Sequence, residues 1–297
     1  MVAGMKRTVF RTPWLPYLLV LPQVVVTVVF FLWPAFDSLR LSLFKVSMFG
    51  DRLLFVGLEN FRRLLFSLDY HRSIVNSFVF AAGVTCLSLL VAFFVAFLAS
   101  QKIRGLGLYR SALLWPYGIP LPVAGIVWLF IFHPAYGLLP YYLSYLTAFE
   151  FNWLLKGWVA MLLIILASTW THLGYNIAFI LAGVLSIPES VLDAASVDGA
   201  GRVRRFWSIV LPLLSPITFL LFVVNMVFAF FETFGVIHAV TQGGPGESTA
   251  IMVFKAYKDG FISMNIGSSA AQSVILMVVV TLLTILQFRF AERRVFN

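Results

Sequence analysis

Six long apolar stretches, separated by shorter polar segments, dominate the pattern of this 297-residue chain. A helix needs about 20 predominantly apolar residues to cross the hydrocarbon core of a bilayer. Each stretch reaches that length, so the pattern predicts six membrane-spanning helices. They are approximately Tyr17–Phe36, Ile74–Ser100, Tyr109–Phe132, Trp158–Leu185, Leu213–His238 and Ser269–Phe290.

The third stretch differs from the others because prolines interrupt its first half. Pro116, Pro120 and Pro122 all lie inside Tyr109–Phe132. A spanning helix tolerates proline where neighbouring helices or water satisfy the freed carbonyls. Two interpretations stay open for this stretch: a span that contains prolines, or a broken or re-entrant segment.

The composition indicates an all-α integral membrane protein. Hydrophobic residues make up 61% of the chain, charged residues make up 11%, and the mean hydropathy is +0.96. A soluble domain carries about 25% charged residues. The chain therefore has too little polar surface to coat a water-soluble globule, and no segment of it reads as a second, soluble domain.

The net charge of +9 also fits a membrane protein. Its basic residues cluster at the ends of the apolar stretches, where they set orientation and meet anionic membrane lipid, so nucleic acid is not needed to explain them. With the N-terminus inside, twelve Lys and Arg residues lie in inner segments and nine in outer ones. We therefore expect both termini in the cytoplasm, residues 37–73 outside as a small cap, and residues 186–212 inside.

The first apolar stretch is predicted to remain in the protein as a span. It is longer than the apolar region of a signal peptide, and no small-residue cleavage site follows it. The single cysteine, Cys86, lies inside an apolar stretch and has no second cysteine with which to form a disulfide.

A charged, glycine-punctuated insertion, Ser186–Pro212, separates two strongly apolar stretches. Ser186 and Glu189 have the spacing of a capping box. In this motif the serine hydroxyl accepts from an early backbone N–H of the helix, and the glutamate carboxylate accepts from the backbone N–H of the serine. The spacing predicts a short helix from there to about Val197. Gly199 is placed to end that helix in a left-handed conformation.

A second short helix is expected to begin near Arg202. Helical spacing then puts Val203, Phe206, Trp207 and Val210 on one apolar face. Three other interpretations compete for this insertion: a DNA-reading helix–turn–helix, a phosphate loop at its paired glycines, and an amphipathic connector on the inner leaflet. The first lacks a supporting core, and the second lacks the G-x-x-x-x-G-K-[ST] pattern.

The insertion resembles the "EAA" loop of permease subunits of bacterial ABC importers. That pattern is Glu-Ala-Ala, three residues, Gly, nine residues, Ile, one residue and Leu-Pro. This chain reads Asp193-Ala194-Ala195, then Gly199, then Ile209-Val210-Leu211-Pro212, with every spacing kept. The single departure is Asp193 in place of glutamate, which keeps the charge on a shorter side chain.

The resemblance implies the type I ABC importer permease fold, in which this loop docks into a groove of a separate ATPase subunit. ATP and magnesium would be bound by that partner, with no cofactor on this chain and no enzymatic activity of its own. The residues that the resemblance assigns to coupling are Glu189, Asp193, Ala194, Ala195, Asp198, Gly199, Gly201, Arg202 and Pro212.

Other segments extend the resemblance over nearly the whole chain. WLPYLLVLPQ, FVGLENF and Thr241–Pro245 are similar to the carbohydrate-uptake branch of these permeases. PYLLVLPQ, IPESVLDAASVDGAGRVRRF, FETFGVIHAVTQGGP and SSAAQSVILM are most similar to the first permease of sn-glycerol-3-phosphate importers. This implies a bacterial inner-membrane complex with a second permease subunit, two ATPase subunits and a periplasmic binding protein. The implied cargo is sn-glycerol 3-phosphate or glycerophosphodiesters, the alternative being a neutral sugar.

Polar residues inside the apolar stretches are candidates for the substrate path, because an unpaired carboxylate in hydrocarbon costs several kcal/mol. Glu232 is the most conspicuous, and headgroup water near the end of its span is the competing explanation. The seven-residue spacing of Asn225 and Glu232 puts both on one helix face, although helix packing would also suit an asparagine. The candidates are His172, Asn176, Asn225, Glu232 and Gln272.

Two further expectations concern the outside of the molecule and rival classes. Gly243, Gly244 and Pro245, together with residues 37–73, are expected to contact the binding protein.

No metal site is predicted, because the histidines are scattered over different segments. An ion-coupled secondary transporter should show repeated halves or paired intramembrane acids, and a membrane enzyme should show a nucleophile–base or metal constellation. Neither pattern is clear in this chain.

Overall fold

The computed structural model describes residues 14–46, 53–99, 106–146 and 151–292, and these residues are mainly helical. In chain order the elements are α1 (Leu15–Thr27), η1 (Val28–Leu32), α2 (Trp33–Leu41), β1 (Phe44–Val46), β2 (Leu53–Phe55), α3 (Glu59–Leu65), α4 (Leu68–Ala99), α5 (Leu106–Leu114), η2 (Trp115–Gly118), α6 (Leu121–Phe132), α7 (Leu138–Leu146), α8 (Gly157–Ser186), α9 (Glu189–Val197), α10 (Arg202–Arg205), η3 (Phe206–Val210), α11 (Leu211–Leu213), α12 (Ser215–Phe231), α13 (Phe234–Val240), α14 (Met252–Tyr257), η4 (Lys258–Ile262) and α15 (Ile266–Glu292).

Within the described residues, four helices are long and apolar enough to cross a membrane, and the number rises to six if two bent helix pairs each count as one span. The four unbroken spans are Leu15–Leu41, Leu68–Ala99, Gly157–Ser186 and Ile266–Arg289. They coincide with the first, second, fourth and sixth apolar stretches. The prediction of about six spans therefore agrees with the fold.

The third apolar stretch is broken, which decides between the two interpretations left open for it. Its two halves, Gly107–Gly118 and Leu121–Phe132, meet at 102°. Ile119 is extended because the residue before a proline avoids the helical region, and Pro120 then precedes the first turn of α6. A second bend of 65° separates Phe206–Leu213 from Ser215–Phe231 in the fifth stretch.

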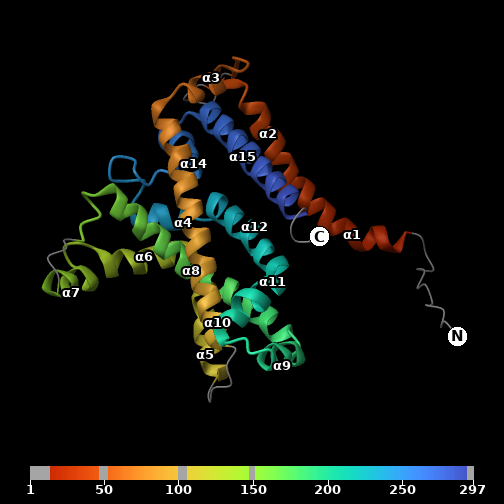
Figure 1. Cartoon of the computed structure of the whole chain (residues 1–297). Helices are drawn as coiled ribbons and strands as arrows, with labels where there is room; N and C mark the ends of the chain where they lie inside the picture. The colour runs from red at the N-terminus through yellow and green to blue at the C-terminus, as the bar shows by residue number, and fades with distance from the viewer. Residues whose placement is uncertain (1–13, 47–52, 100–105, 147–150, 293–297) are drawn as a thin grey trace.

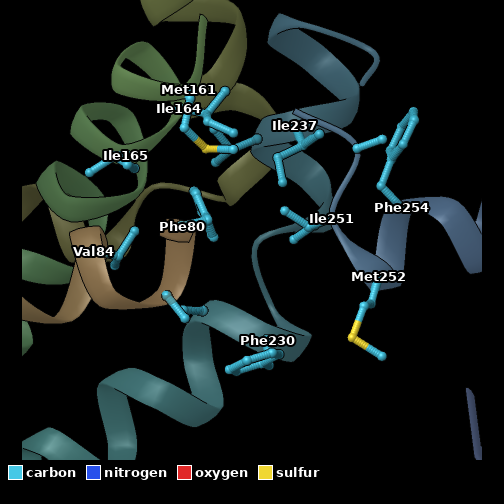
Figure 2. Packing of buried hydrophobic residues seen from close by; sticks show 14 of the residues in the cluster. Phe80, Val84, Met161, Ile164, Ile165, Phe230, Ile237, Ile251, Met252 and Phe254 are labelled. Atoms are coloured by element: carbon cyan, nitrogen blue, oxygen red, sulfur yellow. The ribbon is translucent and has the colours of Figure 1, made fainter. Parts of the chain in front are cut away.

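α8 lies at the centre of the bundle, and α4 packs along it. Of the most apolar 18-residue window of each helix, 67% is buried in α8 but none in the first span. Figure 2 shows how Phe80 and Val84 of α4 face Ile164 and Ile165 of α8 in the larger hydrophobic cluster. Figure 1 shows that α1, the first part of the first span, projects away from the other helices, whereas α2 runs beside α15.

A smaller hydrophobic cluster lies toward the other end of the same helices. Ala92 and Ala96 of α4 pack there with Ile177 and Ile180 of α8, and Leu214 joins them from the start of the fifth span. The small side chains on α4 let the helix backbones approach closely, as is common where helices associate in lipid.

Residues 37–73 contain the only β-structure among the described residues. β1 and β2 pair antiparallel, with Phe44 opposite Phe55. The side chain of Asn60, just inside α3, donates to the carbonyl oxygens of Ser42 at 2.8 Å and Phe44 at 3.0 Å. This small folded unit and α9 lie at opposite ends of the molecule (Figure 1).

The crossing of α6 and α13 depends on two glycines. A Cβ atom on Gly125 would lie 2.8 Å from the Cβ atom of Ala239, and one on Gly235 would lie 2.9 Å from the ring of Pro122. These distances are shorter than van der Waals contact, so any larger side chain forces the helices apart.

We expect Gly125→Leu to lower the free energy of unfolding by about 1–3 kcal/mol, the usual cost of overpacking a closely packed core. Thermal unfolding of the purified protein in detergent measures the effect. Gly118→Ala is the control, because a Cβ atom at Gly118 meets no atom within 4 Å. Equal melting temperatures for the two variants would contradict the close crossing.

Candidate functional site

The insertion between α8 and the fifth span begins with α9, Glu189–Val197, which ends as the sequence predicts. Gly199 has a φ of +75°, its N–H donates to the Ser196 carbonyl oxygen at 3.1 Å, and the N–H of Ala200 donates to the Ala195 carbonyl oxygen at 2.9 Å. These two bonds form a Schellman motif. A Cβ atom at Gly199 would meet no atom within 4 Å, so the left-handed backbone conformation is what favours glycine there.

The predicted capping box at the start of α9 is wrong. Ser186 is the last residue of α8, and its hydroxyl donates to the Gly183 carbonyl oxygen at 2.7 Å. α9 begins after Pro188 and has no side-chain cap. The physical reason is Pro188 itself: it favours an extended Ile187, which separates the two helices at that point.

Most of the predicted coupling residues are exposed on and after α9. Asp193 and Ala194 are exposed, whereas Ala195 is 7% exposed and packs against the rest of the chain. Glu189, Asp198, Gly199, Gly201 and Pro212 are also exposed, and the side chain of Arg202 lies outside the described residues. Val197 is 87% exposed and was not predicted as a surface residue. The end of α9 thus combines carboxylates with a bare apolar side chain.

The second helix begins at Arg202, as predicted, and continues as α10, η3 and α11. The apolar side chains Phe206, Trp207 and Val210 do not share one environment, and the side chain of Val203 lies outside the described residues. Phe206 packs edge-on against Phe93 and Phe97 of α4, with ring centroids 6.4 Å and 5.6 Å apart, and Val210 is buried. Trp207 is 63% exposed. All three side chains belong to η3, Phe206–Val210, in which the helix has the wider π-helical turn.

Asn176 of α8 and Asn225 of α12 bind each other and are both fully buried. Each side-chain N–H donates to the other's side-chain oxygen, at 3.1 Å and 2.6 Å, and each also donates to a carbonyl oxygen four residues earlier in its own helix. Both N–H donors of each amide are therefore bonded within this chain. The arrangement is that of helix packing, the alternative that the sequence left open for Asn225.

His172 lies one helical turn before Asn176 and is also buried. Its ring stacks on Phe228 at a centroid distance of 4.0 Å and lies 5.1 Å from the ring of Tyr175. The Nε2 atom has no hydrogen-bond partner among the described residues. Tyr117 of η2, 53% exposed, covers the edge of this ring stack at 6.1 Å.

Glu232 lies at the break between α12 and α13 and is exposed. Neither an ion pair nor a side-chain hydrogen bond of Glu232 occurs within the part of the chain that the structure describes. Its backbone N–H donates to the Phe228 carbonyl oxygen and ends α12. The carboxylate is therefore exposed on the outer surface of this chain.

Gln272 takes part in a buried polar network at the start of α15. Its side-chain N–H donates to Asp259 Oδ2 at 2.6 Å, and Lys255 Nζ lies 3.0 Å from the other oxygen of that carboxylate. Gln272 is 1% exposed. The contact ties α15 to α14 and η4 and separates Gln272 from the other path candidates.

Gly243, Gly244 and Pro245 form a tight loop after α13. Gly243 has a φ of +82°, and a Cβ atom there would lie 2.7 Å from the Phe254 ring. The Thr249 hydroxyl donates to the Gly244 carbonyl oxygen at 2.8 Å. This loop is fastened to α4, because the side chain of Asn76 donates to the Glu247 carbonyl oxygen at 3.0 Å.

An ion pair closes the same loop, with Lys258 Nζ 2.6 Å from Glu247 Oε1. The hydrogen bond from Lys258 holds the pKa of Glu247 below its ordinary value, against a smaller opposing effect of burial. In the described part of the chain, no group of three or more His, Cys, Asp or Glu side chains is arranged to hold a metal ion.

These features define a multi-pass membrane protein with an exposed helical insertion between two spans. A family model described as "Binding-protein-dependent transport system inner membrane component" matches residues 88–296. The chain belongs to this family. It is a permease subunit of an ABC importer in the inner membrane, and is a transport subunit, not an enzyme.

Relatives and solved structures agree with this class. The chain is 48% identical over 291 residues to the "sn-glycerol-3-phosphate transport system permease protein UgpA" of Rhizobium meliloti (strain 1021), covering 98% of this chain and 99% of that protein. The protein of the same name from Pectobacterium atrosepticum is 45% identical, covering 98% of each chain. A bacterial ABC transporter for the import of the acidic polysaccharide alginate has the same fold, with a TM-score of 0.81 at 18% identity over 95% of this chain and 96% of that one.

The hydrogen bonds between Asn176 and Asn225 should contribute to the free energy of unfolding. Asn176→Leu or Asn225→Leu alone leaves the side-chain oxygen of the other amide buried without its donor, which costs about 1–3 kcal/mol. The double variant removes both amides together and should recover part of that loss. Thermal unfolding in detergent of the four proteins gives the coupling energy, and strictly additive losses would show that the two amides do not act as a pair.

The ion pair between Glu247 and Lys258 should make the stability of the protein depend on pH. Because folding lowers the pKa of Glu247 from 4.5, its stabilising contribution is complete above that value and is lost as the pH falls through the folded-state pKa. For a pair this exposed the contribution is at most about 1 kcal/mol.

Glu247→Gln should therefore lower the melting temperature at pH 7, and the difference should shrink as the pH falls from 4.5 toward 3. Melting curves of both proteins over this range measure the effect. A difference between the proteins that stays constant down to pH 3 would contradict the assignment.

Proposed function

We propose that this chain is one membrane subunit of an ATP-driven importer for sn-glycerol 3-phosphate and its glycerophosphodiesters. The near full-length identity to permeases named for sn-glycerol-3-phosphate transport supports this cargo. In this proposal, a periplasmic binding protein delivers the cargo and the membrane subunits move it by alternating access.

The proposed complex contains a second, different permease subunit and two ATPase subunits, which bind ATP and magnesium. The sequence of this chain has no phosphate-binding G-x-x-x-x-G-K-[ST] motif, in line with hydrolysis on a partner. Both termini would lie in the cytoplasm, which puts α9 on the ATPase side and the 243–245 loop on the binding-protein side. Residues 37–73, which include α3, would also lie on the binding-protein side. The opposite positions of α9 and α3 in Figure 1 support this division.

The observation that carries the proposal is the exposed helix α9 with its fixed end. A short helix presents Asp193, Ala194 and Val197 to the outside, and the Schellman motif at Gly199 sets the direction in which the chain returns to the membrane. We infer that this surface docks into a groove of the ATPase. The small side chain of Ala194 permits close approach, and Val197 supplies apolar contact area.

The cargo imposes an electrostatic requirement on the path. A phosphate monoester carries about −1.5 to −2 charges at pH 7. No lysine or arginine occurs in 74–99, 111–132, 158–185, 215–231 or 269–288. We therefore infer that positive potential along the path comes from helix N-termini or from the second permease, the alternative being a path kept weakly polar so that the cargo is released. Because Glu232 is exposed on the surface of this chain, we infer that it pairs with a cation of the second permease.

Reconstitution tests the cargo. Proteoliposomes that contain both permeases, the ATPase and the binding protein should accumulate sn-glycerol 3-phosphate only when ATP is present on the ATPase side. ATP-dependent uptake of a neutral oligosaccharide, with no uptake of glycerol phosphates, would overturn the cargo and leave the family intact. Uptake that needs a proton gradient and no ATPase would overturn the importer itself.

The left-handed turn after α9 predicts how coupling responds to substitution at Gly199. Gly199→Val places a β-branched residue at a φ of +75°, which costs about 1–3 kcal/mol of backbone strain. We expect it to misdirect α9 and to lower ATP-dependent transport at least about fivefold. Gly199→Asn is the matched control, because asparagine tolerates this conformation. Equal transport by both variants would contradict a role for the turn.

A further inference from the structure

Arg205, which the sequence pattern did not single out, joins the two helices of the insertion. Its Nη1 atom donates to the Ser196 hydroxyl oxygen at 2.7 Å and lies 3.4 Å from the Leu192 carbonyl oxygen. The Ser196 hydroxyl donates in turn to that Leu192 carbonyl oxygen at 2.8 Å. Arg205 belongs to α10, whereas Leu192 and Ser196 belong to the last turns of α9.

The chemistry of this contact favours arginine. The guanidinium presents several N–H donors in one plane, so it can reach a hydroxyl and a carbonyl together. Its positive charge also lies at the C-terminal end of α9, where the helix dipole is negative. The Schellman motif at Gly199 fixes the backbone at the end of α9. The Arg205 contact adds a second link between the two helices, made by side chains.

The contact continues into the membrane through the next residue. Phe206 packs against Phe93 and Phe97 of α4. Val210 and Leu214, farther along the same segment, are buried in the cluster that includes Ala92 and Ile177. A displacement of α9 that reaches Arg205 is thus passed to α4 and to the start of α12 through packed side chains.

We propose that Arg205 is a positioning residue that fixes α9 to the start of the fifth span, so that movement imposed on α9 moves α4 and α12. This role rests on the proposed function, because it requires an ATPase docked on α9. It differs from docking, because Arg205 contacts residues of its own chain.

The test compares complexes that carry Arg205→Gln, Arg205→Lys, Ser196→Ala and the control Arg204→Gln. Arg204 is the exposed neighbour, and its substitution removes the same charge one residue away. Three quantities are measured: the amount of ATPase that co-purifies, the rate of ATP hydrolysis, and the number of cargo molecules transported per ATP.

We expect Arg205→Gln to retain the ATPase and its hydrolysis but to lower transport per ATP about threefold to tenfold, the factor that one partly screened charge-assisted hydrogen bond supplies. Arg205→Lys should recover part of the transport per ATP. Ser196→Ala should give a value between those of Arg205→Gln and the unsubstituted protein. Arg204→Gln should give the same value as the unsubstituted protein. An unchanged ratio in Arg205→Gln would overturn the proposal. Loss of ATPase binding in Arg205→Gln alone would also overturn it, by making Arg205 a docking residue.

A distance measurement gives a readout that is independent of activity. Spin labels at Val197 and Leu213, which are 87% and 52% exposed, are placed in a Cys86→Ser background. We expect one narrow distance distribution that broadens with Arg205→Gln and not with Arg204→Gln. Identical distributions in both variants would overturn the proposal. If the unsubstituted complex retains no ATPase at all, the proposed function fails, whatever the distances show.

Discussion

The close packing of α4 on α8 is the constraint on which the rest of the structure depends. Lipid chains are as apolar as leucine, so helices in a bilayer associate through fit and hydrogen bonds, with little help from the hydrophobic effect. The buried face of α4 accordingly carries small side chains such as Ala81, Ser88 and Ala92. A Cβ atom at Gly83 would lie 2.7 Å from Ile165 of α8, which shows how near the two helices are. α12 is then fastened to α8 by the asparagine pair.

Both ends of the molecule that we propose to be functional are attached to α4. At one end, Asn76 and Ser77 hold the segment after the 243–245 loop, since the backbone N–H of Met252 donates to the Ser77 hydroxyl oxygen at 2.8 Å. At the other end, Phe206 packs on Phe93 and Phe97. One straight helix of 32 residues therefore links the face proposed for the binding protein with the face proposed for the ATPase.

Apolar length and turn chemistry were enough to predict much of this fold. The four unbroken spans, the end of α9 at Gly199 and the start of α10 at Arg202 follow from local rules, because each depends on residues close together in the chain. The prolines of the third stretch signalled a disturbance, but pattern alone did not choose between a kink and a 102° break. The capping box failed because Ser186 satisfied the preceding helix instead.

The candidate site was less predictable because its contacts join distant residues. Asn176 and Asn225 were candidates for the substrate path, with helix packing as the alternative for Asn225. Their mutual hydrogen bonds appear only when α8 and α12 are placed together. Arg205 was counted only as one charge among several. Its contact with Ser196 depends on how α10 folds back on α9.

The central claim is that α9 is the part of this chain that meets the ATPase, and site-specific cross-linking tests it most directly. A cysteine replaces Ala194 in a Cys86→Ser background, and the assembled complex is treated with a short thiol-reactive cross-linker. The account predicts a cross-link to the ATPase subunit whose yield changes when ATP is added. A cross-link to the periplasmic binding protein, or none to the ATPase in an active complex, would contradict it.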